Sequence, residues 1–200
     1  MDMWDPYFRS VIKYVPGGSK KIVFDRYHIM THIGPAVDRV RRGEHRELLN
    51  EGCPSLTGSK YLWLYGEENL PQKHRARFRD LKSLNLKTGR AWAIKESLRE
   101  LWSDKTLRCG ERHWRQWYFW ATHSQLPPMI AAAATVRRHL PNVLTYFKHR
   151  ITNATSESLN AKIQTIKQMA NGFRSREYFK IAVYFHCGGL DLYPGTHGTS

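Results

Sequence analysis

The segment from residue 151 to residue 174 holds the side chains whose types and spacing suit chemistry. Asn153 or Thr155 is expected to cap the start of a helix there, and Gly172 is expected to end it. At about 100° per residue, one face of this helix is apolar and consists of Leu159, Ile163, Ile166 and Ala170. The polar stripe beside that face consists of Glu157, Asn160, Gln164 and Lys167. A carboxylate, two amides and an ammonium in one row suit a site that contacts a metal ion and nucleic acid. Glu157 alone has a structural alternative, because the helix dipole favours an acid in the first turn.

A second polar group follows a short apolar run near the start of the chain. Lys21–Phe24 is rich in apolar and β-branched residues, which predicts a buried strand. Asp25 and His28 come directly after it and lead into a helix with apolar residues at helical spacing. Because α/β sheets place their sites at the carboxyl ends of strands, both residues are candidates for a site. The structural alternative is a hydrogen-bonded pair at the end of a strand.

The charge balance indicates a polyanionic partner. The chain has 32 Lys and Arg against 17 Asp and Glu, a formal net charge of +15. Basic side chains that neutralise phosphates release condensed counterions, so this excess favours nucleic acid. An acidic membrane is the competing partner, but no apolar run reaches about 18 residues and no signal peptide is visible. An ordinary basic soluble protein is the remaining explanation of the charge.

The three cysteines are widely spaced and form neither a disulfide framework nor a zinc-binding pattern; they are Cys53, Cys109 and Cys187. Reduced thiols in a cytoplasmic protein are the expectation.

The elements that would position these groups are mostly helical. Asp5 and Pro6 predict the start of a first helix, and residues 43–150 show helical spacing throughout. Breaks are expected at Gly58, Pro71, Thr88-Gly89, Cys109-Gly110 and Pro127-Pro128. A last helix is expected from Ser175 to His186, followed by a loose tail. The pattern predicts an α/β fold that is predominantly helical, with a helical block inserted into it.

Two further groups allow both a structural and a binding interpretation. Trp114, Trp117 and Trp120 have side chains that stack on unpaired bases in other proteins, but their helical spacing beside Ala121 is more typical of a core. A basic cluster earlier in the helical block consists of Lys73, Arg75, Arg77, Arg79 and Lys82. This cluster either faces DNA or is a solvated helix face.

Four motifs along the chain are specific when taken together. Their positions are Met1-Asp2-Met3 with Tyr7, the segment 24–28, the aromatic helix from Trp117, and the segment from Thr152 to Phe173. With these motifs the sequence resembles the DDE transposases of bacterial insertion sequences, of the group named after the ISL-three element. The resemblance extends from Met1 to about Tyr193.

The resemblance implies a partial RNase H-like fold with a large all-helical insertion. Residues 1–42 and 151–187 would belong to the RNase H-like core, residues 43–150 would form the insertion, and residues 188–200 would be the tail. Asp2 would be the second catalytic carboxylate and Glu157 the third, and both would bind Mg²⁺ or Mn²⁺. Asp25 and His28 would be accessory residues near this site. The DNA-contacting residues would be Asn160, Gln164, Lys167 and Arg174.

The expected activity is metal-dependent cleavage and strand transfer of DNA in transposition. Transposon ends and target DNA are the expected partners, a homo-oligomer is compatible with this role, and neither a membrane nor a small-molecule cofactor is expected. The expected location is the bacterial cytoplasm, at the nucleoid. The first aspartate of the family is not present in this sequence, which suggests an N-terminally truncated chain that is inactive on its own.

Two alternatives remain open at this stage. The first is a non-catalytic basic DNA-binding remnant or regulator. The second is a helical RNA-binding protein without a metal site, which fits the charge but leaves the Glu157 stripe unexplained.

Overall fold

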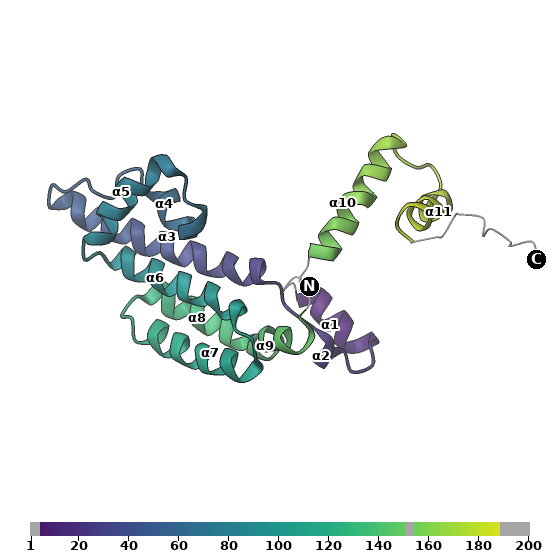
Figure 1. Ribbon diagram of the computed structural model, residues 1–200, viewed down its shortest axis with the longest axis horizontal. Coiled ribbons are helices and arrows are strands. Elements are labelled where there is room, and N and C mark those ends of the chain that lie inside the picture. The colour runs from purple at the N-terminus through teal and green to yellow at the C-terminus, as the bar shows by residue number, and fades with distance from the viewer. Residues whose placement is uncertain (1–4, 151–153, 189–200) are drawn as a thin grey trace, which may run out of the picture. The chain divides into compact units, whose positions relative to one another are not determined.

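The computed structural model describes residues 5–150 and 154–188, and in these ranges every regular element is a helix (Figure 1). The chain divides into two compact units, Met1–Ile151 and Thr152–Ser200. The first unit contains α1 (Asp5–Tyr14), α2 (Gly18–Lys21), α3 (Arg26–Asn50), α4 (Lys60–Leu64), η1 (Glu67–Asn69), α5 (Gln72–Ser83), α6 (Lys87–Glu100), η2 (Leu101–Ser103), α7 (Leu107–Thr122), α8 (Pro127–Arg138) and α9 (Leu140–His149). The second contains α10 (Ala154–Met169) and α11 (Arg176–Cys187).

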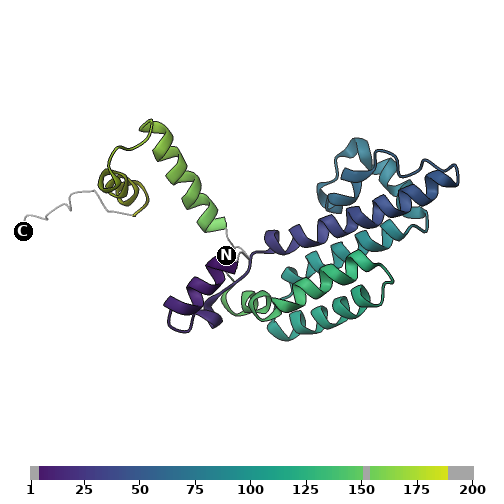
Figure 2. The same ribbon diagram turned by 180° about the vertical axis from the view of Figure 1, so that it is seen from behind.

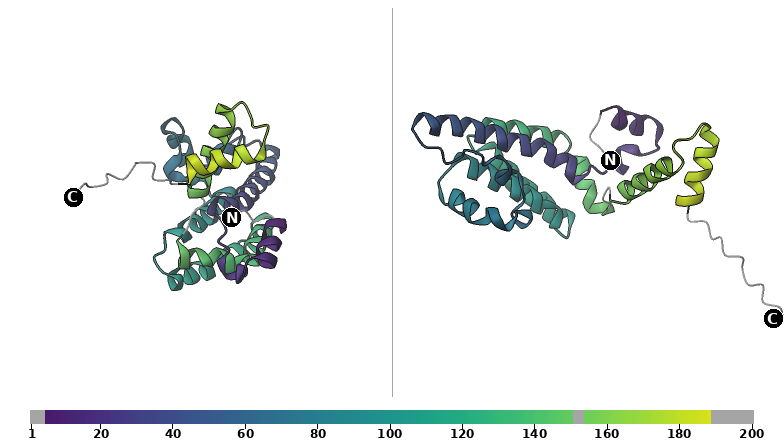
Figure 3. Two further views of the ribbon diagram at one scale, coloured as in Figure 1. Left: turned by 90° about the vertical axis from the view of Figure 1, so that its right-hand side faces the viewer. Right: turned by 90° about the horizontal axis from the view of Figure 1, so that it is seen from above.

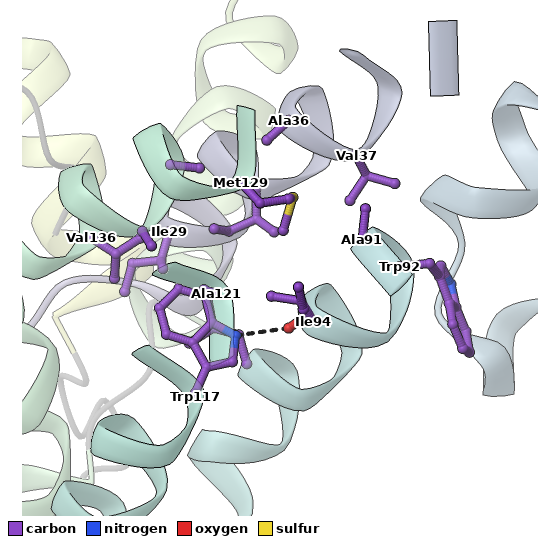
Figure 4. Close-up of a cluster of buried hydrophobic side chains, with 14 of the residues drawn as sticks. Ile29, Ala36, Val37, Ala91, Trp92, Ile94, Trp117, Ala121, Met129 and Val136 are labelled. Atoms are coloured by element: carbon purple, nitrogen blue, oxygen red, sulfur yellow. Dashed lines mark hydrogen bonds between the residues drawn. The ribbon is translucent and has the colours of Figure 1, made fainter. Parts of the chain in front are cut away.

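The first unit is built around α3, which packs along its length against α6 and α8 (Figures 1 and 2). Ile29, Ile33 and Val37 recur at helical spacing along α3 and are completely buried. Figure 4 shows how α7 closes this core: Trp117 lies beside Ala121, and its indole Nε1 donates a hydrogen bond of 2.8 Å to the carbonyl oxygen of Ile94. The long helix and its neighbours therefore form one continuous apolar core.

The predicted strand at Lys21–Phe24 is wrong. Lys21 ends α2, and the next three residues form an extended connection in which Ile22 and Phe24 are buried. A neighbouring helix, not a neighbouring strand, supplies hydrogen-bond partners to this segment. The Phe24 N–H donates to the carbonyl oxygen of Asn142 in α9 at 3.2 Å, and the Asn142 amide donates to the carbonyl oxygen of Ile22 at 3.5 Å. A buried extended segment needs the same apolar residues as a strand, which explains the error.

Two of the five expected breaks are also wrong, while the other three separate helices. Thr88-Gly89 lies in the first turn of α6, and Cys109-Gly110 lies near the start of α7. Gly58 lies before α4, Pro71 directly before α5, and Pro127-Pro128 at the first positions of α8. The predominantly helical character is confirmed, whereas the sheet of an α/β fold has no strand in residues 5–150 and 154–188.

In residues 154–188, the second unit is a pair of helices joined by a short connection (Figure 3). Gly172 has φ of 94°, and its N–H bonds to the carbonyl oxygen of Lys167 at 3.0 Å, so it ends α10 as predicted. Because α10 begins at Ala154, Thr155 is not its N-cap, and Asn153 lies outside the described residues. Ser175 caps α11, since its side chain accepts a hydrogen bond from the Glu177 N–H.

Candidate functional site

The two predicted catalytic carboxylates fall at the margins of the described structure. Asp2 lies outside the described residues. Glu157 lies in the first turn of α10, and its side chain is outside the described set. Their roles as metal ligands therefore remain predictions.

The rest of the predicted stripe is open to solvent along α10. Asn160, Gln164 and Lys167 are all exposed, as is Arg174 in the connection to α11. On the apolar side of the helix, Ile166 is buried. This arrangement places two amides and an ammonium, which are suitable donors to phosphate oxygens, on an accessible edge.

Asp25 and His28 lie at the start of a helix and not at the end of a strand. Asp25 is the N-cap of α3, and its Oδ1 accepts a hydrogen bond of 3.2 Å from the N–H of Tyr27. The imidazole of His28 packs edge-on against the Tyr27 ring, with 5.4 Å between ring centroids. The capping bond gives Asp25 a local structural role, and its membership of a catalytic site remains a prediction.

No cluster of three or more His, Cys, Asp or Glu side chains is arranged to hold a metal ion within the described part of the chain. These side chains therefore supply no complete ligand set for the implied Mg²⁺ or Mn²⁺. In the predicted site, Asp2 and Glu157 would supply the carboxylates.

The predicted basic cluster on α5 is exposed at all five positions. Arg77 donates to the carbonyl oxygen of Thr57, and Lys82 forms an ion pair of 2.7 Å with Glu67. Arg79 has no ion pair or hydrogen bond in the described ranges. The cluster is therefore accessible to a polyanion, although part of it is already engaged within the fold.

The three tryptophans of α7 separate into two kinds. Trp114 and Trp117 belong to the core, with 5% and 1% of their surface exposed, as their spacing predicted. Trp120 is 42% exposed. The sequence does carry a signal for this difference, since Trp114, Trp117 and Ala121 share one helical face and Trp120 lies at its edge.

Sequence patterns did not reveal the roles of Lys95 and Glu44, which are buried charged residues. The ammonium of Lys95 donates to the carbonyl oxygens of Trp63, Leu64 and Tyr65 at 2.7–3.1 Å, at the end of α4. Burial lowers the pKa of Lys95, and the neighbouring Glu96 at 3.1 Å opposes this shift. Glu44 is the second and binds the start of α6. Both residues hold helices together and line none of the surfaces described above.

The described helices include none that is long and apolar enough to pass through a membrane.

Comparison with known proteins connects these features to one family. The family model for ISL3-type DDE transposases, described as "Transposase", matches residues 1–183. The chain is 24% identical over 186 residues to the transposase of insertion sequence element IS1001 from Bordetella parapertussis, covering 92% of this chain and 45% of that protein. It is 28% identical over 148 residues to the transposase of IS1557 from Mycobacterium tuberculosis (strain CDC 1551 / Oshkosh), covering 74% of this chain and 33% of that protein. The chain thus spans less than half the length of these relatives. No solved structure matches it.

Proposed function

The chain belongs to the ISL3 family of insertion-sequence transposases, and we propose that it forms part of a DDE catalytic domain that cleaves and joins DNA. The observation that carries this proposal is the open polar edge of α10, where exposed Asn160, Gln164 and Lys167 follow Glu157 inside the segment matched by the family. An acid able to bind a metal ion, followed on the same helix by exposed donors to phosphate oxygens, suits metal-dependent DNA chemistry.

In this proposal Asp2 and Glu157 hold the metal ions, and the α10 edge positions the DNA. When bound, two divalent ions activate the attacking oxygen and stabilise the leaving oxygen of a phosphodiester. The amides of Asn160 and Gln164 and the ammonium of Lys167 would hold phosphate oxygens, which fixes the register of the DNA without reading its sequence. Asp25 and His28 would be accessory residues that contact the groups of this site and do not bind the metal ions themselves.

The proposal includes an RNase H-like core from residues 1–42 and 151–187, with residues 43–150 as the helical insertion. The boundary after residue 42 falls within α3, which is continuous from Arg26 to Asn50. The part of the proposed core in residues 1–42 and the insertion would therefore share helix α3. The bacterial cytoplasm, at the nucleoid, is the proposed location.

Metal binding tests the assignment of the two carboxylates directly. Isothermal titration of the 200-residue chain with Mn²⁺ is expected to show binding that Asp2→Asn and Glu157→Gln each weaken at least tenfold. Glu177→Gln is the matched control, because Glu177 is an exposed acid in the first turn of α11. If both carboxylate variants bind Mn²⁺ as the control does, the catalytic assignment is wrong.

Activity provides a second test of the same proposal. Residues 1–200 contain two of the three acids that the family needs, so we expect no cleavage by these residues alone. In a transposase that also carries the first aspartate, Glu157→Gln is expected to abolish cleavage of DNA bearing the element ends, while binding to that DNA persists. DNA binding without Mn²⁺ binding, and without cleavage even when the first aspartate is supplied, would instead indicate a non-catalytic regulator.

A further inference from the structure

Three adjoining hollows lie along α5, α6 and α7 in the first unit. The first, of about 640 Å³, lies between η1 and α5 and includes Arg75 and Arg79. The second, of about 400 Å³, lies where the α5–α6 connection faces α7 and includes Arg90. The third, of about 340 Å³, lies between α6 and α7. Lys82 borders the first two and Trp120 borders the last two, so neighbouring hollows share a side chain, and the three together are called the α5–α7 groove.

Most of the acids in this groove are already paired. Glu67 forms its ion pair with Lys82, and Asp104 lies 3.0 Å from the imidazole of His113. Glu68 bonds the guanidinium of Arg99, which lowers the pKa of Glu68 to about 2. Glu100 is the acid of the groove that has no ion pair in the described ranges.

The arginines of the groove are not paired in this way. In residues 5–150 and 158–188, no carboxylate partner is found for Arg75, Arg79, Arg90 or Arg112. Arg75 uses only its Nε, which donates to the carbonyl oxygen of Leu70 at 3.3 Å. Each of the four therefore presents free guanidinium donors with the geometry that phosphate oxygens accept.

Trp120 provides the feature that separates this groove from a simple cationic patch. It is the exposed member of the three α7 tryptophans and lies between the second and third hollows. Its neighbour Trp117 is fixed in the core by the bond to Ile94, so the helix that carries Trp120 is held in place. An indole at the edge of a cationic groove stacks on a base only when that base is unpaired and accessible.

The third hollow also has groups that suit the edge of a base. Beyond Trp120 it is lined by Ser97, Glu100 and Gln116, which together offer both donors and acceptors. A carboxylate in this position accepts hydrogen bonds from the exocyclic amine of cytosine or adenine. Arg75, Arg79 and Arg90 thus line the first two hollows, and beyond Trp120 the third hollow combines Arg112 with these polar side chains.

We propose that the α5–α7 groove binds a single-stranded DNA segment, with phosphates at the arginines and one unpaired base stacked on Trp120. The choice of DNA as the partner rests on the proposed transposase function. The helices that line the groove contain neither of the predicted catalytic carboxylates, so its residues are not part of the proposed metal site. Strands with unpaired bases form where a DNA end is opened for cleavage and joining.

The test compares single-stranded and duplex DNA of equal length by fluorescence anisotropy, using the 200-residue chain without metal. Trp120→Ala is expected to weaken binding of the single strand by about 5- to 100-fold, the effect of losing one stacked base, and to change duplex binding less than twofold. Phe119→Ala is the matched control. Phe119 is the preceding residue on α7 and is 63% exposed, but it borders none of the three hollows.

The arginines are tested by the salt dependence of the same binding. Arg79→Ala with Arg90→Ala is expected to reduce the slope of log affinity against log salt by about 0.7 for each lost phosphate contact of a single strand. Arg39→Ala with Arg46→Ala, two exposed positions on α3, should leave that slope unchanged.

Circular dichroism of each variant shows that the fold is retained. The proposal would be overturned if Trp120→Ala and Phe119→Ala reduced the affinity for single-stranded DNA equally. It would also be overturned if Trp120→Ala reduced the affinities for single strand and duplex equally. Because no metal is present, the result is independent of the Mn²⁺ titration. Failure of the groove and failure of the catalytic assignment are therefore distinguishable.

Discussion

At the scale of single residues, Glu44 shows how one buried carboxylate joins two parts of the core. Its oxygens accept hydrogen bonds from the N–H of Lys87 at 2.6 Å, and from the N–H and hydroxyl of Thr88 at 2.7 Å and 2.6 Å. Leu86, at the N-cap of α6, has no side chain able to make such bonds. A residue on α3 therefore supplies the cap for α6 from more than 40 positions away.

Replacing Glu44 by Ala should leave these donors buried without a partner. We expect the free energy of unfolding to fall by about 1.5–3 kcal/mol, the usual range for hydrogen bonds to a charged group, as measured by urea denaturation. Glu47→Ala is the matched control one turn along. Its ion pair with Lys87, at 2.6 Å, joins two exposed side chains and should contribute at most about 1 kcal/mol. If the two variants lowered the free energy of unfolding equally, the capping role of Glu44 would be contradicted.

At the scale of helices, Gly110 sets how closely α7 and α9 approach each other. A Cβ at this position would lie 2.5 Å from two ring carbons of Phe147. Such a distance is well below van der Waals contact, so the two helices pack with the glycine directly against the ring.

Gly110→Ala is therefore expected to destabilise the protein by about 1–3 kcal/mol through overpacking, as measured by thermal or urea unfolding. Gly43→Ala should instead stabilise the protein. Gly43 lies within α3 with nothing close to its added Cβ, and alanine in a helix interior is favoured by about 0.5–1 kcal/mol. Combining Gly110→Ala with Phe147→Leu should cost less than the sum of the single changes. Strict additivity of the two changes would show that this contact does not limit the packing.

The same glycine illustrates what sequence patterns could and could not predict. Apolar residues at helical spacing located α6 and α7, because that spacing is a local property. The local pattern predicts a break at Gly110, because the Phe147 ring that packs against this glycine lies on another helix. It also predicts a strand at Lys21–Phe24, because the hydrogen-bond partner of Ile22 is Asn142, some 120 positions away. At the site, the polar stripe of α10 was predictable because the rotation of about 100° per residue within one helix places its side chains in a row. The groove beside Trp120 was not predictable, because it forms only where three helices pack together.

At the scale of the whole molecule, the two units differ in how much they bury. In the described ranges, Ile166 is the only buried hydrophobic residue of the second unit, and the core of the first unit draws on nearly all of its helices. The apolar side chains that α11 exposes are Tyr178, Ile181, Tyr184 and Phe185. Since short helices gain most of their stability from packing, α10 and α11 should open far more readily than the core.

Hydrogen exchange of the 200-residue chain measures this difference helix by helix. The amides of α11 are expected to exchange at least tenfold faster than those of α5, which has the same length of 12 residues but buries Phe78 and Leu81. Comparable protection of the two helices would show that the second unit is not less stable than the core.

Added DNA and Mg²⁺ should slow amide exchange in α10, because they are proposed to bind the polar edge that follows Glu157. A ligand that binds only the folded helix suppresses its opening. The Glu157→Gln variant should lose the part of this protection that depends on Mg²⁺, while the part that depends on DNA phosphates remains.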